Sequence, residues 1–172
     1  MKKILFSLVA LMAVMTVQAQ SICASWRTMQ PLVETEEDGS LAIQSFTYTF
    51  NEDGTYYMVD ELTESTEPAP TMALEIALSI EVRGTYTLDG DQLALTPDVN
   101  TVKPDVLSVS MNGQVTDNPM VTNNVKSMID NPMFKAQFAE PQTCTVKVSD
   151  SMLEMNDGEQ TLTLTRFATI NN

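Results

Sequence analysis

Residues 73–93 read ALEIALSIEVRGTYTLDGDQL and decide the fold class. Large apolar residues occupy every second position of its first half: Leu74, Ile76, Leu78, Ile80 and Val82. This period of two predicts a β-strand with one buried face rather than a helix. Gly84 then interrupts the pattern, as at a β-bulge or a bend in a curved sheet, and Tyr86 continues it. We predict a two-residue turn at Asp89-Gly90 that places Tyr86 opposite Leu93.

Glycines that follow Asp or Asn extend this interpretation along the chain. Five of the six glycines do so: Asp38-Gly39, Asp53-Gly54, Asp89-Gly90, Asn112-Gly113 and Asp157-Gly158. These pairs accept the positive φ angles of tight hairpin turns, so the alternating segments around them are predicted to be strands. A further strand is expected within Val102–Met111, starting after Pro104. The acidic, proline-containing stretch Thr63–Thr71 is predicted to be a loop.

Residues 119–139 break the strand pattern and predict a short helical insertion. Asn118-Pro119 and Asn131-Pro132 each place proline at a first helical position. Val121, Val125 and Ile129 then follow at helical spacing. We therefore expect two short helices before the last hairpins.

Residues 1–19 have the features of a secretory signal peptide. A basic start at Lys2 and Lys3 precedes a short apolar run and a small-residue cleavage site, which predicts export to the periplasm or the cell exterior. The run is shorter than the ~20 residues of a membrane-spanning helix. Ile22 is not the small residue that a lipid-anchor motif needs before Cys23, so no lipid anchor is expected. Residues 20–172 are then a single domain.

The charge and the cysteines restrict the partners and the compartment. The 172 residues contain 23 acidic and nine basic side chains, and loss of Lys2 and Lys3 changes the net charge from −14 to −16. A protein this acidic is a poor partner for nucleic acid or anionic membranes. Cys23 and Cys144 are the two cysteines. In an oxidising compartment they could form one disulfide, which we favour over two unpaired thiols.

No catalytic or metal-binding constellation stands out. The chain contains no histidine, which removes the commonest general base and the usual catalytic zinc ligands. Pairs of carboxylates could hydrolyse glycosides, but 23 acids make any such pair unspecific. The oxygen-rich segments 51–54 and 89–91 lack the spacing of a calcium loop and are explained by turn chemistry. We predict no enzymatic activity, no metal and no cofactor.

Several short motifs together resemble the secreted bacterial lipocalin-like, or calycin, domains. They are Ser25-Trp26-Arg27, residues 50–56, Arg83-Gly84-Thr85-Tyr86, Asp91-Gln92-Leu93 and residues 162–166. The resemblance implies an antiparallel β-barrel of about eight strands in which Trp26 packs beneath the barrel against Arg166. Ala24 departs from the family, which has glycine two residues before the tryptophan. Strand parity alone leaves Arg166 either buried beside Leu162 and Leu164 or facing solvent.

A barrel of this size suggests a binding protein for a small apolar molecule. Its expected lining consists of seven residues: Tyr48, Tyr57, Leu74, Ile76, Leu78, Ile80 and Tyr86. Met128, Met133 and Phe134 would then cap one end. The alternative is a non-enzymatic interaction module with a filled core, whose acidic segment Asp60–Glu81 meets a protein or a cationic surface. An interior cavity of a few hundred Å³ would favour the ligand-binding protein.

Overall fold

The computed structural model describes residues 22–35, 40–69 and 72–167. The predicted signal peptide, residues 1–19, and the Asp38-Gly39 turn lie outside these ranges. Within them, no helix is both long and apolar enough to cross a membrane.

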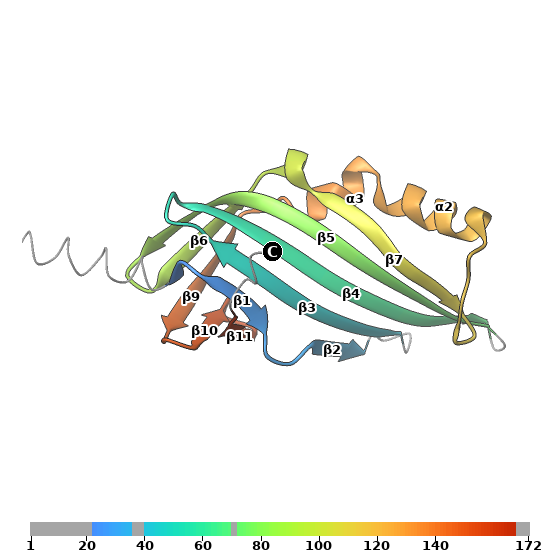
Figure 1. The fold of residues 1–172 in the computed structure, drawn as a ribbon, viewed down its shortest axis with the longest axis horizontal. Helices are drawn as coiled ribbons and strands as arrows, with labels where there is room; N and C mark the ends of the chain where they lie inside the picture. The colour runs from blue at the N-terminus through green and yellow to red at the C-terminus, as the bar shows by residue number, and fades with distance from the viewer. Residues whose placement is uncertain (1–21, 36–39, 70–71, 168–172) are drawn as a thin grey trace, which may run out of the picture.

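Eight antiparallel strands close into a barrel (Figure 1). In order around the ring they are β1 (Ser25–Thr28), β3 (Leu41–Phe50), β4 (Thr55–Ala69), β5 (Met72–Asp89), β6 (Gln92–Pro97), β9 (Gln142–Val148), β10 (Met152–Asn156) and β11 (Thr161–Arg166). The ring closes where β11 pairs with β1, so that Trp26 lies opposite Arg166. The predicted all-β fold, an antiparallel barrel of about eight strands with a short helical insertion, is confirmed.

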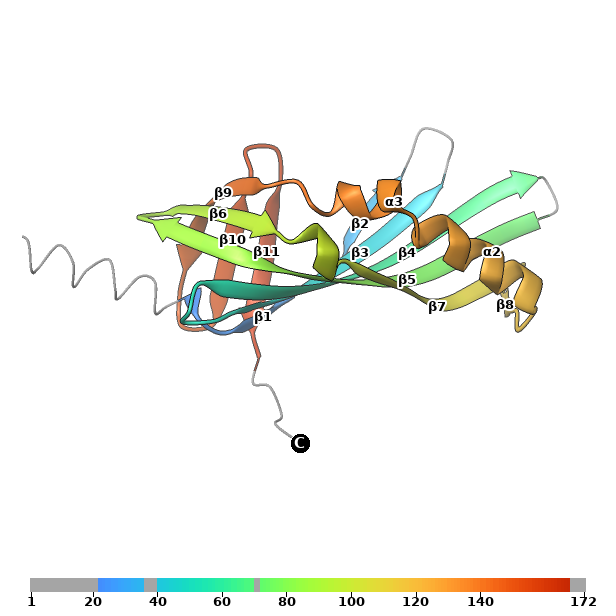
Figure 2. The ribbon, with the colours of Figure 1, turned by 90° about the horizontal axis from the view of Figure 1, so that it is seen from above.

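Three of these strands continue beyond the barrel and form an extension of the sheet. Further strands extend this sheet at both edges: β2 (Leu32–Thr35) pairs with β3, β7 (Lys103–Met111) pairs with β5, and β8 (Gln114–Val115) pairs with β7. A 3₁₀ turn, η1 (Val99–Thr101), connects β6 to β7. Two helices, α2 (Pro119–Ile129) and α3 (Pro132–Gln137), lie over one face of this extension (Figures 1 and 2). The barrel is therefore continuous with a sheet extension that is covered by two helices on one face.

The helical insertion forms as its sequence predicts. Each helix begins after an asparagine cap: the Asn118 side chain accepts from the Met120 N–H, and the Asn131 side chain accepts from the Phe134 N–H. The buried face of α2 carries Val125 and Ile129. These residues pack against the extension in a cluster with Leu78 and Val109. The apolar face of β5 before Gly84 thus lies partly beneath the helices rather than in the barrel.

Gly84 does not mark a bulge, because the β4–β5 register continues through it without a shift. It marks instead the place where β5 stops pairing with β7 and starts pairing with β6. A Cβ at this position would lie 2.3 Å from the Thr96 carbonyl oxygen and 2.7 Å from the Tyr56 ring. Glycine is required for close approach of the neighbouring chain, not for a change of register.

The β5–β6 turn differs from the prediction by one residue. Asp89 pairs with Gln92, so the turn residues are Gly90-Asp91, and Gly90 supplies the positive φ of 63°. Tyr86 consequently lies opposite Leu95 rather than Leu93. Moving a turn by one residue moves the pairing by two, which keeps the same side chains inward.

Two strand boundaries also differ from the prediction. The stretch Thr63–Thr71 is not a loop over its described part, because β4 continues to Ala69 and pairs with β5 as far as Ala69–Met72. The strand pairing of the long β5 outweighs the poor strand propensity of the acidic segment. β7 begins at Lys103 and includes Pro104, near the start of a strand that has few partners on its outer side.

The end of the barrel near Trp26 is filled by side chains. Trp26 is fully buried, and its indole Nε1 donates to the Ile22 carbonyl oxygen at 2.8 Å. The Arg166 guanidinium carbon lies 4.8 Å from the Trp26 ring centroid, a cation–π distance. Arg166 is itself exposed, so it covers the ring from the solvent side. The Trp26–Arg166 contact implied by the family resemblance is present.

The two cysteines are not bonded to each other, which corrects the favoured disulfide. Cys23 lies at the filled end, where its Sγ is 3.3 Å from the Tyr86 hydroxyl. Cys144 lies on β9 and lines the cavity described below. Disulfide formation needs a specific geometry between the two side chains, and the sequence positions of the cysteines alone could not show whether it is met.

Candidate functional site

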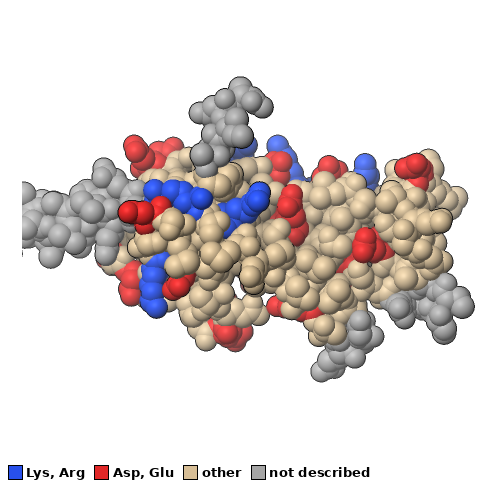
Figure 3. Space-filling view, turned by 60° about the horizontal axis from the view of Figure 1, so that its bottom comes forward, with Lys and Arg blue, Asp and Glu red and all other residues tan. Residues whose placement is uncertain are grey.

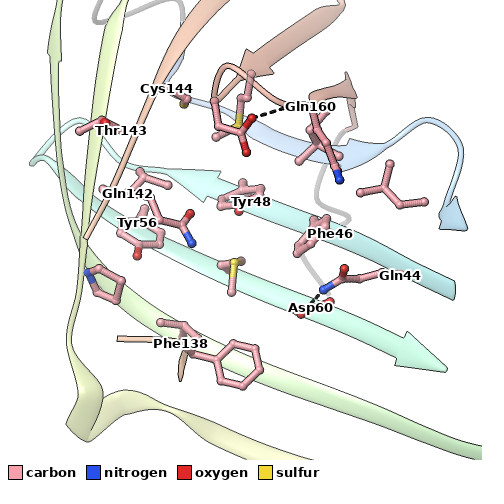
Figure 4. Close-up of a pocket in the computed structure, with 18 of the residues that line it drawn as sticks. Gln44, Phe46, Tyr48, Tyr56, Asp60, Phe138, Gln142, Thr143, Cys144 and Gln160 are labelled. Atoms are coloured by element: carbon pink, nitrogen blue, oxygen red, sulfur yellow. Dashed lines mark hydrogen bonds between the residues drawn. The ribbon is translucent and has the colours of Figure 1, made fainter. Parts of the chain in front are cut away.

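The other end of the barrel encloses a cavity of about 520 Å³ (Figure 4). Its walls come from the barrel strands, from β2, from the end of α3 and from the loops at this end. The lining residues are Leu32, Glu34, Gln44, Phe46, Tyr48, Tyr56, Met58, Asp60, Val82, Leu95, Pro97, Gln137, Phe138, Gln142, Thr143, Cys144, Met155, Asp157, Gln160 and Leu162. The volume lies within the range of about 300–1,000 Å³ that is typical of small-molecule sites.

Aromatic side chains of β3 line the middle of the cavity. Phe46 and Tyr48 stack with ring centroids 6.2 Å apart, and Tyr48 stacks in turn on Phe50 of the filled core at 5.8 Å. In Figure 4, Phe138 lies on one side of these rings, and Cys144 and Gln160 lie on the other. The period of two along β3 places these rings on one face, so the strand itself builds an apolar wall.

Asp60 is the unusual polar residue of this wall. It follows Tyr56 and Met58 on the inward face of β4, and it is only 2% exposed. Its Oδ2 accepts a hydrogen bond from Gln44 Nε2 at 2.7 Å (Figure 4). No described residue donates to its Oδ1. A buried carboxylate oxygen without a donor is costly, and such groups are rare in native proteins.

The surroundings of Asp60 disfavour its charged form. The pKa of Asp60 is raised from 3.8 to about 6: burial raises it most, the Gln44 hydrogen bond lowers it in part, and the nearby Glu61 charge adds a smaller increase. At neutral pH the group remains mostly ionised. The cavity therefore presents a negative charge that the protein compensates with a single amide donor.

Further polar groups lie around the cavity and at its rim. In Figure 4, the Gln142 side chain extends from β9 toward Tyr56. At the rim, Gln160 Nε2 donates to Glu34 Oε1 at 3.2 Å and thus links the β10–β11 loop to β2. Asp157 also lies at this rim. Among the described lining residues there is no Lys and no Arg.

The hydroxyl and thiol groups of the cavity are held in their neutral forms. Burial raises the pKa of Tyr56 to about 12. Burial also raises the pKa of Tyr48, and the charges of Tyr56, Asp60 and Cys144 add to that effect. The pKa of the Cys144 thiol rises to about 11, first through burial and then through the Asp157 charge. These groups can donate hydrogen bonds, but they are not activated nucleophiles or bases at neutral pH.

Of the seven residues predicted to line a ligand cavity, the structure places Tyr48 in the wall. Ile80 is fully buried beside Val82 in a small cluster under α3. Tyr86 lies in the filled core, where its hydroxyl donates to the Asn51 carbonyl oxygen at 2.9 Å. Tyr57 lies on the outer face, with the Arg83 guanidinium carbon 5.2 Å from its ring centroid.

The remaining three predicted lining residues, Leu74, Ile76 and Leu78, pack in the extension beneath α2. They lie on the same face of β5 as the cavity wall, but they belong to the part of the strand that pairs with β7 outside the barrel. Of the predicted cap, Phe134 of α3 packs against the buried clusters that contain Leu78 and Ile80, whereas Met128 and Met133 are exposed. The period of two identifies the inward face of β5 correctly, but it does not show where along the strand the barrel ends.

The most informative residue of the site, Asp60, was not among the predicted lining residues, although the sequence around it carries a signal. Tyr56, Met58, Asp60 and Leu62 occupy alternate positions of one strand. An acidic residue at an inward position of an otherwise apolar alternation marks either a strand end or a buried charge. The hairpin at Asp53-Gly54 sets this parity, so Asp60 could have been identified.

Within the described ranges, no group of three or more Cys, Asp or Glu side chains is placed to hold a metal ion. The oxygens of the Asp53-Gly54 turn serve the turn itself, since Asp53 Oδ1 accepts from the N–H and the hydroxyl of Thr55. Comparison with family models gives no match, and no curated protein is similar enough in sequence to indicate a family.

Proposed function

We propose that this chain is an exported, lipocalin-like protein that binds a small, largely apolar molecule in the cavity at the open end of its barrel. The observation that carries the proposal is the cavity of about 520 Å³ with aromatic walls, in a barrel whose other end is filled. The export step rests on the sequence of residues 1–19, and the family assignment rests on the motifs around Trp26 and Arg166.

The contrast between the two ends of the barrel supports binding rather than a purely structural core. The filled end buries Trp26, Phe50 and Leu164 in one apolar cluster, as expected of a close-packed core. The open end leaves unfilled volume against Tyr48, Met58 and Phe138. Unfilled apolar volume lowers stability, so an interior of this kind is expected where a ligand fills it.

The alternative of an interaction module with a filled core fits the structure less well. That hypothesis needs a barrel interior without space, and it relies on Asp60–Glu81 as an exposed acidic surface. Asp60 is buried, and the acidic side chains of the rest of this segment are divided between the two strands of a hairpin. Figure 3 shows acidic side chains spread over one face of the molecule rather than gathered in a block.

Titration with the uncharged fluorescent probe N-phenyl-1-naphthylamine tests the proposal. The wild-type protein is expected to bind one equivalent saturably, with the increase in fluorescence that accompanies transfer to an apolar site. Gln142→Trp places a large side chain in the cavity and is expected to weaken binding at least about tenfold by steric exclusion. Thr145→Trp is the matched control, because Thr145 is exposed on the same strand but does not line the cavity.

Absence of saturable binding by the wild-type protein would contradict the proposal. Equal affinities of the wild-type protein and Gln142→Trp would place the probe elsewhere and would have the same consequence. Native mass spectrometry of the protein purified from its own host is the complementary experiment. It is expected to show a non-covalent adduct of low mass that is reduced in Gln142→Trp.

A further inference from the structure

We propose that the cavity selects molecules that carry a protonated amine on an apolar body, and that Asp60 is the residue that recognises the ammonium group. This inference rests on the proposed function, since it concerns the ligand of the same cavity. It gives a chemical class to a ligand that the cavity shape alone describes only as apolar.

The geometry of Asp60 is the first argument. The carboxylate is 98% buried, it borders the cavity, and Oδ1 has no donor among the described residues. Its other oxygen is already held by Gln44 at 2.7 Å, which fixes the orientation of the group. An ammonium N–H placed at Oδ1 would complete the hydrogen bonds of the carboxylate and neutralise its charge. Charge-assisted bonds of this kind are about twice as strong as neutral ones.

The charges around Asp60 are the second argument. Glu34 and Asp157 lie at the rim, and no basic side chain lines the cavity among the described residues. A carboxylate or phosphate ligand would therefore meet the negative charges of Asp60 and of the rim without a compensating cation among the described lining residues. A neutral alcohol could donate to Asp60 but would leave its charge uncompensated. A cation is the ligand whose charge this set of groups complements.

The aromatic rings are the third argument. Phe46 is paired with Asp60 across the β3–β4 ladder, and Tyr48 lies next along the same face of β3. Aromatic faces attract cations and also contact alkyl chains, so they suit both ends of an amphiphilic amine. Phe46, Tyr48 and Asp60 all line the same cavity, so the rings and the carboxylate can contact one ligand.

Calorimetric titration with three ligands of equal chain length, decylamine, 1-decanol and decanoate, tests the assignment at neutral pH. Decylamine is expected to bind at least about tenfold more tightly than 1-decanol, with decanoate the weakest, because hydrogen bonds to charged groups contribute more than neutral ones. In Asp60→Asn the side chain keeps its shape and loses its charge. The preference for decylamine over 1-decanol is then expected to fall to less than about threefold, while the affinity for 1-decanol changes little.

Two variants distinguish amine binding in the cavity from non-specific attraction of the amine to an acidic protein. Glu61→Gln removes a charge from the neighbouring residue, which is exposed and points to the other face of β4, and it is expected to keep the amine preference. Gln142→Trp is expected to lose decylamine binding if that binding occurs in the cavity. Retention of the preference in Asp60→Asn, or equal loss in Glu61→Gln, would overturn the role of Asp60.

The outcomes also distinguish this inference from the proposed function. If the wild-type protein binds all three ligands with similar affinity, or prefers decanoate, the cavity binds apolar chains but the amine assignment is wrong. If it binds none of them, both the assignment and the proposed function are overturned for ligands of this size. Because Asp60→Asn is expected to stabilise the fold, misfolding of the variant does not obscure the result.

Discussion

Replacing Asp60 by asparagine is expected to stabilise the protein at neutral pH. The residue is 2% exposed, and one of its carboxylate oxygens has no donor among the described residues. Asparagine has nearly the same shape and can still accept the hydrogen bond from Gln44. The substitution therefore removes a buried charge without removing packing, and a gain in the free energy of unfolding follows.

The magnitude follows from the pKa of Asp60. Burial raises the pKa from the 3.8 of an exposed carboxyl group to about 6 in the folded protein. At about 1.4 kcal/mol per pH unit, this difference corresponds to about 3 kcal/mol at neutral pH. We take this value as an upper limit, because rearrangement around the carboxylate relieves part of the cost.

The sign of the pH dependence distinguishes this mechanism from others. An acid with a raised pKa in the folded state destabilises that state only when it is ionised. Below about pH 4, Asp60 is protonated in both states and its burial does not lower the free energy of unfolding. Stability is lost as the pH rises from about 4 to 6, and the full destabilisation by the buried charge is present above that range. The other acidic groups near Asp60 are Glu61 on the same strand and Tyr48 on β3. Both are unchanged in the variant.

Urea denaturation followed through the fluorescence of Trp26, the single tryptophan, measures the effect at pH 4 and at pH 7.5. The stability gain of Asp60→Asn over the wild type is expected to approach 3 kcal/mol at pH 7.5 and to vanish near pH 4. Glu61→Gln is the control and is expected to change stability by less than about 0.5 kcal/mol, as is usual for an exposed charge. A gain that is equal at the two pH values, or a variant that is less stable at pH 7.5, would refute the reasoning.

Four further results are expected. Arg166→Met should lower the free energy of unfolding by about 1 kcal/mol through loss of the cation–π contact with Trp26, measurable by urea denaturation. Gly84→Ala should cost about 3 kcal/mol or more, because the new methyl group would lie 2.3 Å from a main-chain carbonyl oxygen, and thermal denaturation would show it. Alkylation of Cys144 by iodoacetamide should be slow at pH 8, accelerate toward pH 10 and be suppressed by bound decylamine, as followed by peptide mass spectrometry. Calorimetry should show that decylamine binding weakens below about pH 6, where Asp60 takes up a proton.

The sequence by itself determined the elements whose signals are local. Alternation along residues 74–82, glycines after Asp or Asn, and asparagine caps before Pro119 and Pro132 specify strands, turns and helices through contacts within a few residues. The same local rules specify which side chains of a strand point inward. Hence the strand-rich fold and its helical insertion could be predicted.

Tertiary structure decided where the barrel ends and what lies inside it. β5 is longer than the barrel. It pairs with β7 before Gly84 and with β6 from Gly84 onward, and this change of partner separates the cavity wall from Leu74, Ile76 and Leu78, which lie beneath α2. Likewise, only the folded chain shows that Cys23 and Cys144 are not bonded to each other and that Asp60 is buried with a single donor. These properties depend on contacts between residues far apart in the sequence, and neither periodicity nor turn chemistry carries information about them.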